Sequence, residues 1–81
     1  MGIEALIDLI ETLRGENGCP WDRKQTPQTI LAYLIEETYE LMDAVESGDP
    51  MEVCGELGDV LFHIFFLVSL FREMGHFDVK D

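Results

Sequence analysis

Basic side chains are scarce in this chain: five Lys and Arg stand against 17 Asp and Glu among 81 residues, which gives a formal net charge of −12. Such a chain repels the phosphates of nucleic acids and the headgroups of anionic membranes, so neither is expected as a partner. An anionic small-molecule substrate would also be repelled unless a metal ion bridged it to the protein. The length allows one small domain over residues 1–81, whose core is marginal without oligomerisation.

Cysteine is scarce as well, and Cys19 and Cys54 show neither zinc-binding spacing nor a disulfide framework. Unpaired thiols in a reducing cytoplasm are the simplest interpretation. The sequence shows no N-terminal signal pattern and no convincing strand alternation. Its most apolar run, residues 60–71, is interrupted by His63 and Ser69 and is too short to span a bilayer, which predicts a core helix.

Residues 3–14 carry apolar side chains at spacings of three and four, which predicts an amphipathic helix that ends at Gly15. Residues 15–25 contain two glycines, an asparagine and a proline, so we expect a loop without regular helix. The loop is a candidate binding surface because it places the only tryptophan, Trp21, beside two basic residues. The alternative is that Trp21 plugs the open end of a small helical bundle.

Two long helices are predicted after this loop. Thr26 and Pro27 have the residue types of an N-cap and a first helical position, and the second helix should run to about residue 47. The segment Gly48-Asp49-Pro50 predicts a tight turn into the third helix, with Glu52 completing a capping box with Asp49. The third helix should end near residue 74, and an antiparallel hairpin results.

Five acidic residues in these two helices follow the patterns E-E-x-x-E and E-x-x-D: Glu36, Glu37, Glu40, Glu56 and Asp59. Residues three or four apart share a helix face, so the hairpin would bring Glu37 and Glu40 opposite Glu56 and Asp59. Converging carboxylates repel one another and are costly to desolvate, and a cation is the usual remedy. Oxygen-only ligands select a hard ion such as Mg²⁺, Mn²⁺ or Ca²⁺.

The alternative is that these acids form solvated helix faces, but no nearby lysine or arginine compensates them. His63 lies one turn beyond Asp59, either as a packed core residue or in contact with a carboxylate. Gly58 costs helix stability, which suggests that the second helix or another subunit approaches the backbone there.

A partner subunit is indicated by the third helix, because residues 60–71 are apolar nearly all round and two other helices cannot cover every side. The second helix carries an apolar arc, with Glu37 at its edge and therefore least able to reach water. The residues of that arc are Ile30, Leu31, Leu34, Ile35, Leu41, Met42 and Val45.

Several motifs together resemble MazG-type nucleoside triphosphate pyrophosphohydrolases, of the all-α NTP pyrophosphatase superfamily. They are Gly18-Cys19-Pro20-Trp21-Asp22-x-x-Gln25-Thr26, Glu36-Glu37-x-x-Glu40, Gly48-Asp49-Pro50, Glu56-Leu57-Gly58-Asp59 and Gly75-x-Phe77-Asp78. The acidic patterns alone are moderately specific, and the G-C-P-W-D loop makes the combination strong. The resemblance covers nearly the whole chain.

This resemblance implies Mg²⁺-dependent hydrolysis of a nucleoside triphosphate to a nucleoside monophosphate and pyrophosphate, with Mn²⁺ as a substitute cation. It implies that Glu37, Glu40, Glu56 and Asp59 bind the metal, with Glu36 orienting or deprotonating water. Trp21, Asp22, Arg23 and Lys24 would border the substrate: the basic pair could hold the outer phosphates, and Trp21 could stack on the base.

We therefore expect an all-α protein, an antiparallel helical hairpin plus an N-terminal helix, that forms a four-helix-type bundle as a cytoplasmic homodimer or tetramer. Two rival functions are a metal-stabilised nucleotide-binding module without turnover and a structural dimerisation domain. Related chains continue after the position of Asp81 into a basic, histidine-containing segment, so this chain is either truncated or unusually short. They also usually carry an amide at the position of His63.

Overall fold

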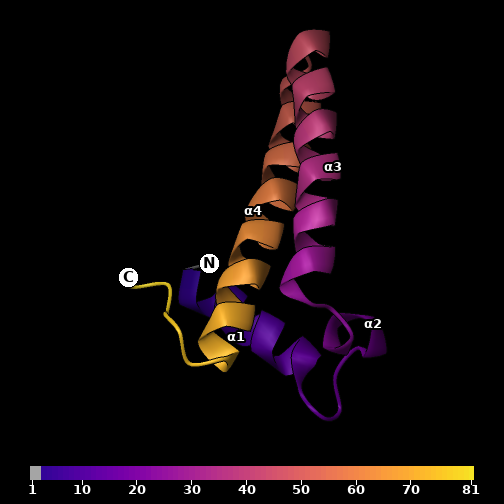
Figure 1. Cartoon of the computed structure of the whole chain (residues 1–81). Coiled ribbons are helices and arrows are strands. Elements are labelled where there is room, and N and C mark those ends of the chain that lie inside the picture. Colours follow the sequence, from indigo (N-terminus) through magenta and orange to yellow (C-terminus); the bar gives the residue numbers. More distant parts are fainter. Residues whose placement is uncertain (1–2) are drawn as a thin grey trace.

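The computed structural model describes residues 3–81 and is all-helical over that range, with four helices in chain order. They are α1 (Ile3–Arg14), α2 (Pro20–Arg23), α3 (Pro27–Ser47) and α4 (Pro50–Glu73). The antiparallel pair α3 and α4 forms a long hairpin, and α1 crosses α4 at the base of that hairpin (Figure 1). The predicted helix boundaries and the all-α class are confirmed.

The ends of the hairpin helices follow from their capping residues. Thr26 accepts a hydrogen bond from the backbone N–H of Thr29, whose hydroxyl in turn accepts from the Thr26 N–H, so α3 begins with a capping box. Gly48 ends α3 with φ of 79°, a left-handed conformation that favours glycine. Asp49 then caps α4 by accepting from the Met51 N–H at 3.0 Å.

The capping box predicted between Asp49 and Glu52 is wrong. The Glu52 carboxylate instead accepts a hydrogen bond from the Ser47 hydroxyl at 3.0 Å. Because Ser47 is the last residue of α3, this contact ties the two helices together at the turn. The tie replaces the local backbone contact that the sequence pattern suggested.

The segment between α1 and α3 is more regular than predicted, because Pro20–Arg23 form one turn of helix, α2. Proline is favoured at a first helical position, which explains why this residue does not prevent the turn. The loop before it is tight: a Cβ on Gly18 would lie 2.2 Å from the Leu13 carbonyl oxygen. The neighbouring Cys19 N–H donates to that same oxygen at 2.8 Å, so the turn excludes a side chain at Gly18.

The core lies at the base of the hairpin, where α1 packs against α4 and Ile30 of α3 joins the same buried cluster. Its buried apolar members are Ile7, Ile10, Ile30, Phe65, Phe66 and Leu70. Further toward the turn, α3 and α4 have only each other to pack against, and Ala44 is the buried apolar residue there. The hairpin therefore projects from a small core, as its elongated outline in Figure 1 shows.

Several large apolar side chains of both hairpin helices stay exposed within the single chain. We call these side chains the apolar face, which is defined by Leu31, Ile35, Met42 and Val45 of α3 and Leu57, Leu61 and Ile64 of α4, all exposed. Val45 and Leu57 line one shared groove near the turn, and Leu31 and Leu67 line another near the base. The predicted arc of α3 is therefore only partly buried, and Ile30 is its fully buried member.

Two expectations about α4 need correction. The apolar run belongs to a helix of 24 residues that holds an 18-residue window of mean hydropathy 1.7, so it is long and apolar enough to cross a membrane by length and composition. Core helices of soluble proteins pass the same test but are mostly buried, whereas 17% of this window is buried within the single chain. The predicted core helix is therefore buried only toward its end, at Phe65, Phe66, Ser69 and Leu70. At Gly58, nothing in residues 3–81 lies within 4 Å of an added Cβ, so α3 does not approach the backbone there and the approach of another subunit stays a prediction.

Candidate functional site

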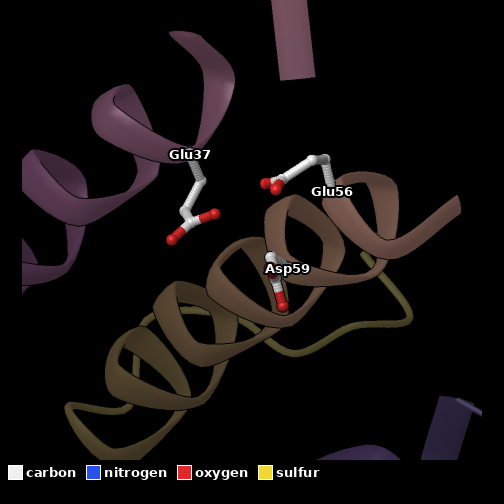
Figure 2. A group of neighbouring side chains, drawn as sticks. All are labelled: Glu37, Glu56 and Asp59. Atoms are coloured by element: carbon white, nitrogen blue, oxygen red, sulfur yellow. The ribbon is translucent and has the colours of Figure 1, made fainter. Parts of the chain in front are cut away.

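Three of the predicted acidic residues converge between the two long helices. Glu37 reaches from α3 toward Glu56 on α4, and Asp59 follows one turn further along α4 (Figure 2). One carboxylate oxygen from each of the three lies within 4.8 Å of the others. The helical spacing in each motif and the tight turn at Gly48 together produce this convergence.

The inner oxygens of this group lack partners. Within residues 3–81, the buried Oε2 atoms of Glu37 and Glu56 have no hydrogen-bond partner. The ion pairs within residues 3–81 are formed by Arg14 and Arg72. They lie near the C-terminal end of α4, away from these carboxylates. Buried acceptors without a donor are costly, so the arrangement calls for a positively charged or donating group.

The pKa values of Glu37 and Glu56 reflect the same unfavourable burial of negative charge. Burial of the Glu37 side chain, and then the neighbouring Glu40 carboxyl and the charges of Asp59 and Glu56, raise the pKa of Glu37 from 4.5 to about 7. Burial and then the charges of Glu40 and Asp59 also raise the pKa of Glu56. Each raised pKa means that the protein favours fewer negative charges here when no cation is present.

The two other predicted acids are placed differently. Glu40 is exposed, but it lines an acidic groove of about 610 Å³ together with Glu56 and Asp59. It therefore lies next to the three-carboxylate group and contributes charge to it. Glu36 is exposed and does not line that groove. Its predicted role in orienting or deprotonating water stays a prediction.

The chemistry of these donors fits a hard divalent cation. All the ligand atoms offered are carboxylate oxygens, which suit Mg²⁺ or Mn²⁺, and the two buried oxygens without hydrogen bonds are free to coordinate. Glu37, Glu56 and Asp59 would hold the ion, with Glu40 at the rim of the groove.

An aromatic row begins one helical turn from these carboxylates. Tyr33, four residues before Glu37, has its ring centroid 5.5 Å from that of Trp21 and 6.2 Å from that of His63. The His63 Nδ1–H donates to the Asp59 carbonyl oxygen at 2.7 Å, since that oxygen can only accept. His63 thus contacts the backbone of Asp59, so of the two predicted alternatives the structure fits the packed, hydrogen-bonded residue and not the carboxylate contact.

The predicted substrate loop divides into exposed and buried parts. Trp21 is 43% exposed and packs edge-on against the core residue Phe66, so it covers the end of the core while leaving surface available. Asp22 is buried. Arg23 and Lys24 are exposed, but neither lines the acidic groove. The Arg23 guanidinium donates to the Glu16 carbonyl at 3.1 Å.

Comparison with known proteins gives a family match for most of the chain. The sequence model described as "MazG nucleotide pyrophosphohydrolase domain" matches residues 25–81, which is more than half of the chain. The chain belongs to the MazG family. The matched range contains all five predicted acidic site residues.

Among MazG relatives, the chain is 46% identical over 80 residues to the nucleoside triphosphate pyrophosphohydrolase of Escherichia coli K12, covering 98% of this chain and 30% of the relative. It is 44% identical over 78 residues to the nucleoside triphosphate pyrophosphohydrolase/pyrophosphatase MazG of Thermotoga maritima, covering 96% and 31%. A nucleoside triphosphate pyrophosphohydrolase of Mycolicibacterium smegmatis is 41% identical over 83 residues, covering 96% and 25%. The chain thus spans about a third or less of these relatives' length.

Two residues of this MazG chain were missed in the sequence analysis. The first is Tyr33, which lies four residues before Glu37, so helical spacing alone could have placed it beside the acids. Its ring lies near that of His63, which follows Asp59 at the same spacing. Arg14 contacts a residue 59 positions away, and no local pattern signals such a contact.

Proposed function

We propose that this chain hydrolyses nucleoside triphosphates between the α and β phosphates, releasing a nucleoside monophosphate and pyrophosphate, with Mg²⁺ or Mn²⁺ as cofactor. The observation that carries the proposal is the convergence of Glu37, Glu56 and Asp59 within 4.8 Å, with two buried oxygens that lack hydrogen bonds. The names of the similar proteins from E. coli and T. maritima support the same reaction.

In this mechanism the two helices of the hairpin position four carboxylates. When bound, a divalent cation would neutralise phosphate charge and lower the pKa of an attacking water. Glu37 and Glu56 would hold the ion from opposite helices, Asp59 would complete the group, and Glu40 would add a fourth carboxylate from the groove. The same acids repel a triphosphate without its cation, so substrate binding depends on the metal.

The substrate's base would lie along the aromatic row of Trp21, Tyr33 and His63. These rings run from the loop toward the carboxylates, and Trp21 and Tyr33 are exposed enough to contact a ligand. Stacking on such rings tolerates any base, because every base has a π-face. Arg23 and Lys24 stay candidates for phosphate contacts. Because neither lines the acidic groove, their long side chains would have to turn toward it to reach a bound phosphate.

We further propose that the apolar face binds a second copy of this chain and completes a four-helix-type bundle. The support is its length, which extends over both hairpin helices, and the exposure of its aliphatic side chains, such as Leu61 at 47%. On α3 its centre lies about 180° from Glu40 by helical geometry, so a partner there would leave the Glu40 side of the acidic groove open. A cytoplasmic location and the lack of nucleic-acid and membrane partners stay predictions.

The direct test is an assay of all ribo- and deoxynucleoside triphosphates with Mg²⁺, which measures pyrophosphate and orthophosphate separately. We expect pyrophosphate without orthophosphate, and loss of release in EDTA. Metal-dependent nucleotide binding without pyrophosphate would instead support the binding module. The structural dimerisation domain would be supported by a chain that binds neither metal nor nucleotide.

A further inference from the structure

Arg14, at the end of α1, makes a set of contacts that joins three parts of the fold. Its side chain is 14% exposed. Nε and Nη2 donate to the two carboxylate oxygens of Glu73 on α4, at 2.6 and 3.1 Å. Nη1 donates to the carbonyl oxygens of Asp22 and Gln25, at 2.5 and 3.2 Å. One guanidinium therefore fixes both α4 and the backbone on either side of Lys24.

The segment that Arg14 holds is the one that carries Trp21. The carbonyl of Asp22, which accepts from Arg14, belongs to the residue next to Trp21. The guanidinium also lies 5.9 Å from the centre of the Phe66 ring, and the Trp21 ring packs edge-on against that same ring. Arg14 and Trp21 thus share one aromatic support at the end of the core.

We propose that Arg14 is a positioning residue for the substrate: it fixes the loop of residues 20–25 so that Trp21 stays aligned with Tyr33 and with the carboxylate site. This inference rests on the proposed function, because it assigns Trp21 a place in substrate binding. Arg14 itself is nearly buried and acts through the loop. Its removal should therefore weaken substrate binding more than metal binding.

Arginine is the residue type that this place requires. Its planar fork donates to both Glu73 oxygens and still has donors for two carbonyls, whereas a lysine ammonium offers three donors from one point. Charge-assisted hydrogen bonds in such a shielded place are also stronger than exposed ones. Lysine would keep the charge opposite Glu73 but could not hold the whole loop.

Arg72 supplies a matched control on the same end of the fold. It also joins α4 to α1, through Glu11 at 2.5 Å, and it lies 3.7 Å from Asp78. Its side chain is 43% exposed, and its hydrogen bond and ion pairs involve no residue of the 20–25 loop. Arg72→Gln therefore removes a cross-helix arginine without releasing Trp21.

The experiment compares the unaltered chain with Arg14→Lys, Arg14→Gln and Arg72→Gln. We expect both Arg14 variants to raise the KM of the best nucleoside triphosphate by about tenfold or more, with little change in kcat. Mg²⁺ affinity, measured by calorimetry without nucleotide, should stay unchanged. Arg72→Gln should keep the original KM. If Arg14→Gln destabilises the chain too far for assay, Arg14→Lys, which keeps the charge, decides the comparison.

A double-variant cycle separates positioning from general destabilisation. If Arg14 acts through Trp21, then Arg14→Lys should raise KM much less in a Trp21→Ala background than in the original chain. Equal KM values for Arg14→Lys and Arg72→Gln would overturn the proposal. Equal effects of Arg14→Lys in the two backgrounds would overturn it as well.

A second readout needs no turnover. Trp21 is the only tryptophan, so acrylamide quenching of its fluorescence reports how firmly the loop is held. We expect faster quenching in both Arg14 variants than in Arg72→Gln, and equal quenching would overturn the positioning role. If the unaltered chain released no pyrophosphate, the proposed function would fail, and this comparison would still decide whether Arg14 holds the loop.

Discussion

Glu37 on α3 and Glu56 on α4 face each other across the hairpin, and each buries one carboxylate oxygen that has no hydrogen-bond partner among residues 3–81. A folded chain that keeps two such oxygens together carries an electrostatic cost. Packing of the hairpin offsets that cost in the metal-free protein, and a bound cation would remove it. The link between metal binding and stability is therefore the most direct consequence of the geometry.

Mg²⁺ or Mn²⁺ should stabilise the fold. A ligand at about 100 times its Kd, bound only by the folded state, adds roughly 2.7 kcal/mol to the free energy of unfolding. We expect a higher Tm in saturating Mg²⁺ than in EDTA at matched ionic strength, measured by circular dichroism. Glu56→Gln should reduce this increase. Identical Tm values with and without the cation would rule out the metal site.

Metal-free stability should fall as pH rises from about 4.5 through about 7. The pKa of Glu37 is raised from 4.5 to about 7, so in this range the folded state binds more protons than the unfolded state. The free energy of unfolding then decreases with pH, and the raised pKa of Glu56 acts in the same direction. Urea unfolding in EDTA across this range measures the slope.

The matched variants for this pH test are Glu37→Gln and Glu46→Gln. Both remove one carboxylate from α3, but Glu46 is exposed and lies outside the acidic groove. Glu37→Gln should flatten the pH dependence, whereas Glu46→Gln should leave it close to that of the original chain. Equal slopes in the two variants would show that overall charge, and not the buried carboxylate, sets the dependence.

Loss of one carboxylate at the site should abolish most activity. Glu40→Gln and Asp59→Asn keep the side-chain shape and remove one charge each, so both should weaken Mg²⁺ binding and reduce pyrophosphate release by about tenfold or more. The fold should stay intact, because less repulsion remains in the metal-free state. Glu46→Gln is the control and should keep full activity. Three equally active variants would support the solvated-surface interpretation.

A charge on the apolar face should break the oligomer. Leu61→Glu places a carboxylate among exposed aliphatic side chains of α4, and burial of an unpaired charge against a second copy is costly. We expect sedimentation equilibrium to give a dimer or larger species for the original chain and a monomer for the variant. The exposed residue Glu46 again offers a control, as Glu46→Gln should not change the mass.

Local sequence signals were sufficient to predict the hairpin of α3 and α4. Thr26-Pro27 and Gly48-Asp49-Pro50 each combine a cap with a residue suited to a helix start or turn, and these short-range preferences determined both helix boundaries. Once the turn was known, helical spacing brought Glu37 opposite Glu56 and Asp59. That part of the site could be predicted because it depends on one turn and two regular helices.

Contacts between distant segments could not be predicted in this way. The bond between Arg14 and Glu73 depends on how α1 crosses α4, and a sequence shows only that a basic residue ends α1. The burial of Asp22 has no local sequence signal either. The capping box predicted for Glu52 is wrong for a related reason. Its carboxylate could accept a hydrogen bond from a local backbone N–H or from the Ser47 hydroxyl across the turn, and the sequence does not show which.

The position of the core at the base of the hairpin divides α3 and α4 into two parts of unequal local stability. At the base, α4 packs against α1 as well as α3, whereas beyond Ala44 the two hairpin helices have contacts only with each other within residues 3–81. The amide protons near the turn can then exchange with solvent through openings that leave the base folded. Glu37 and Asp59 lie between the base and the turn of the hairpin. A cation bound to both would link α3 to α4 there, so it would slow amide exchange near the turn without contacting the turn itself.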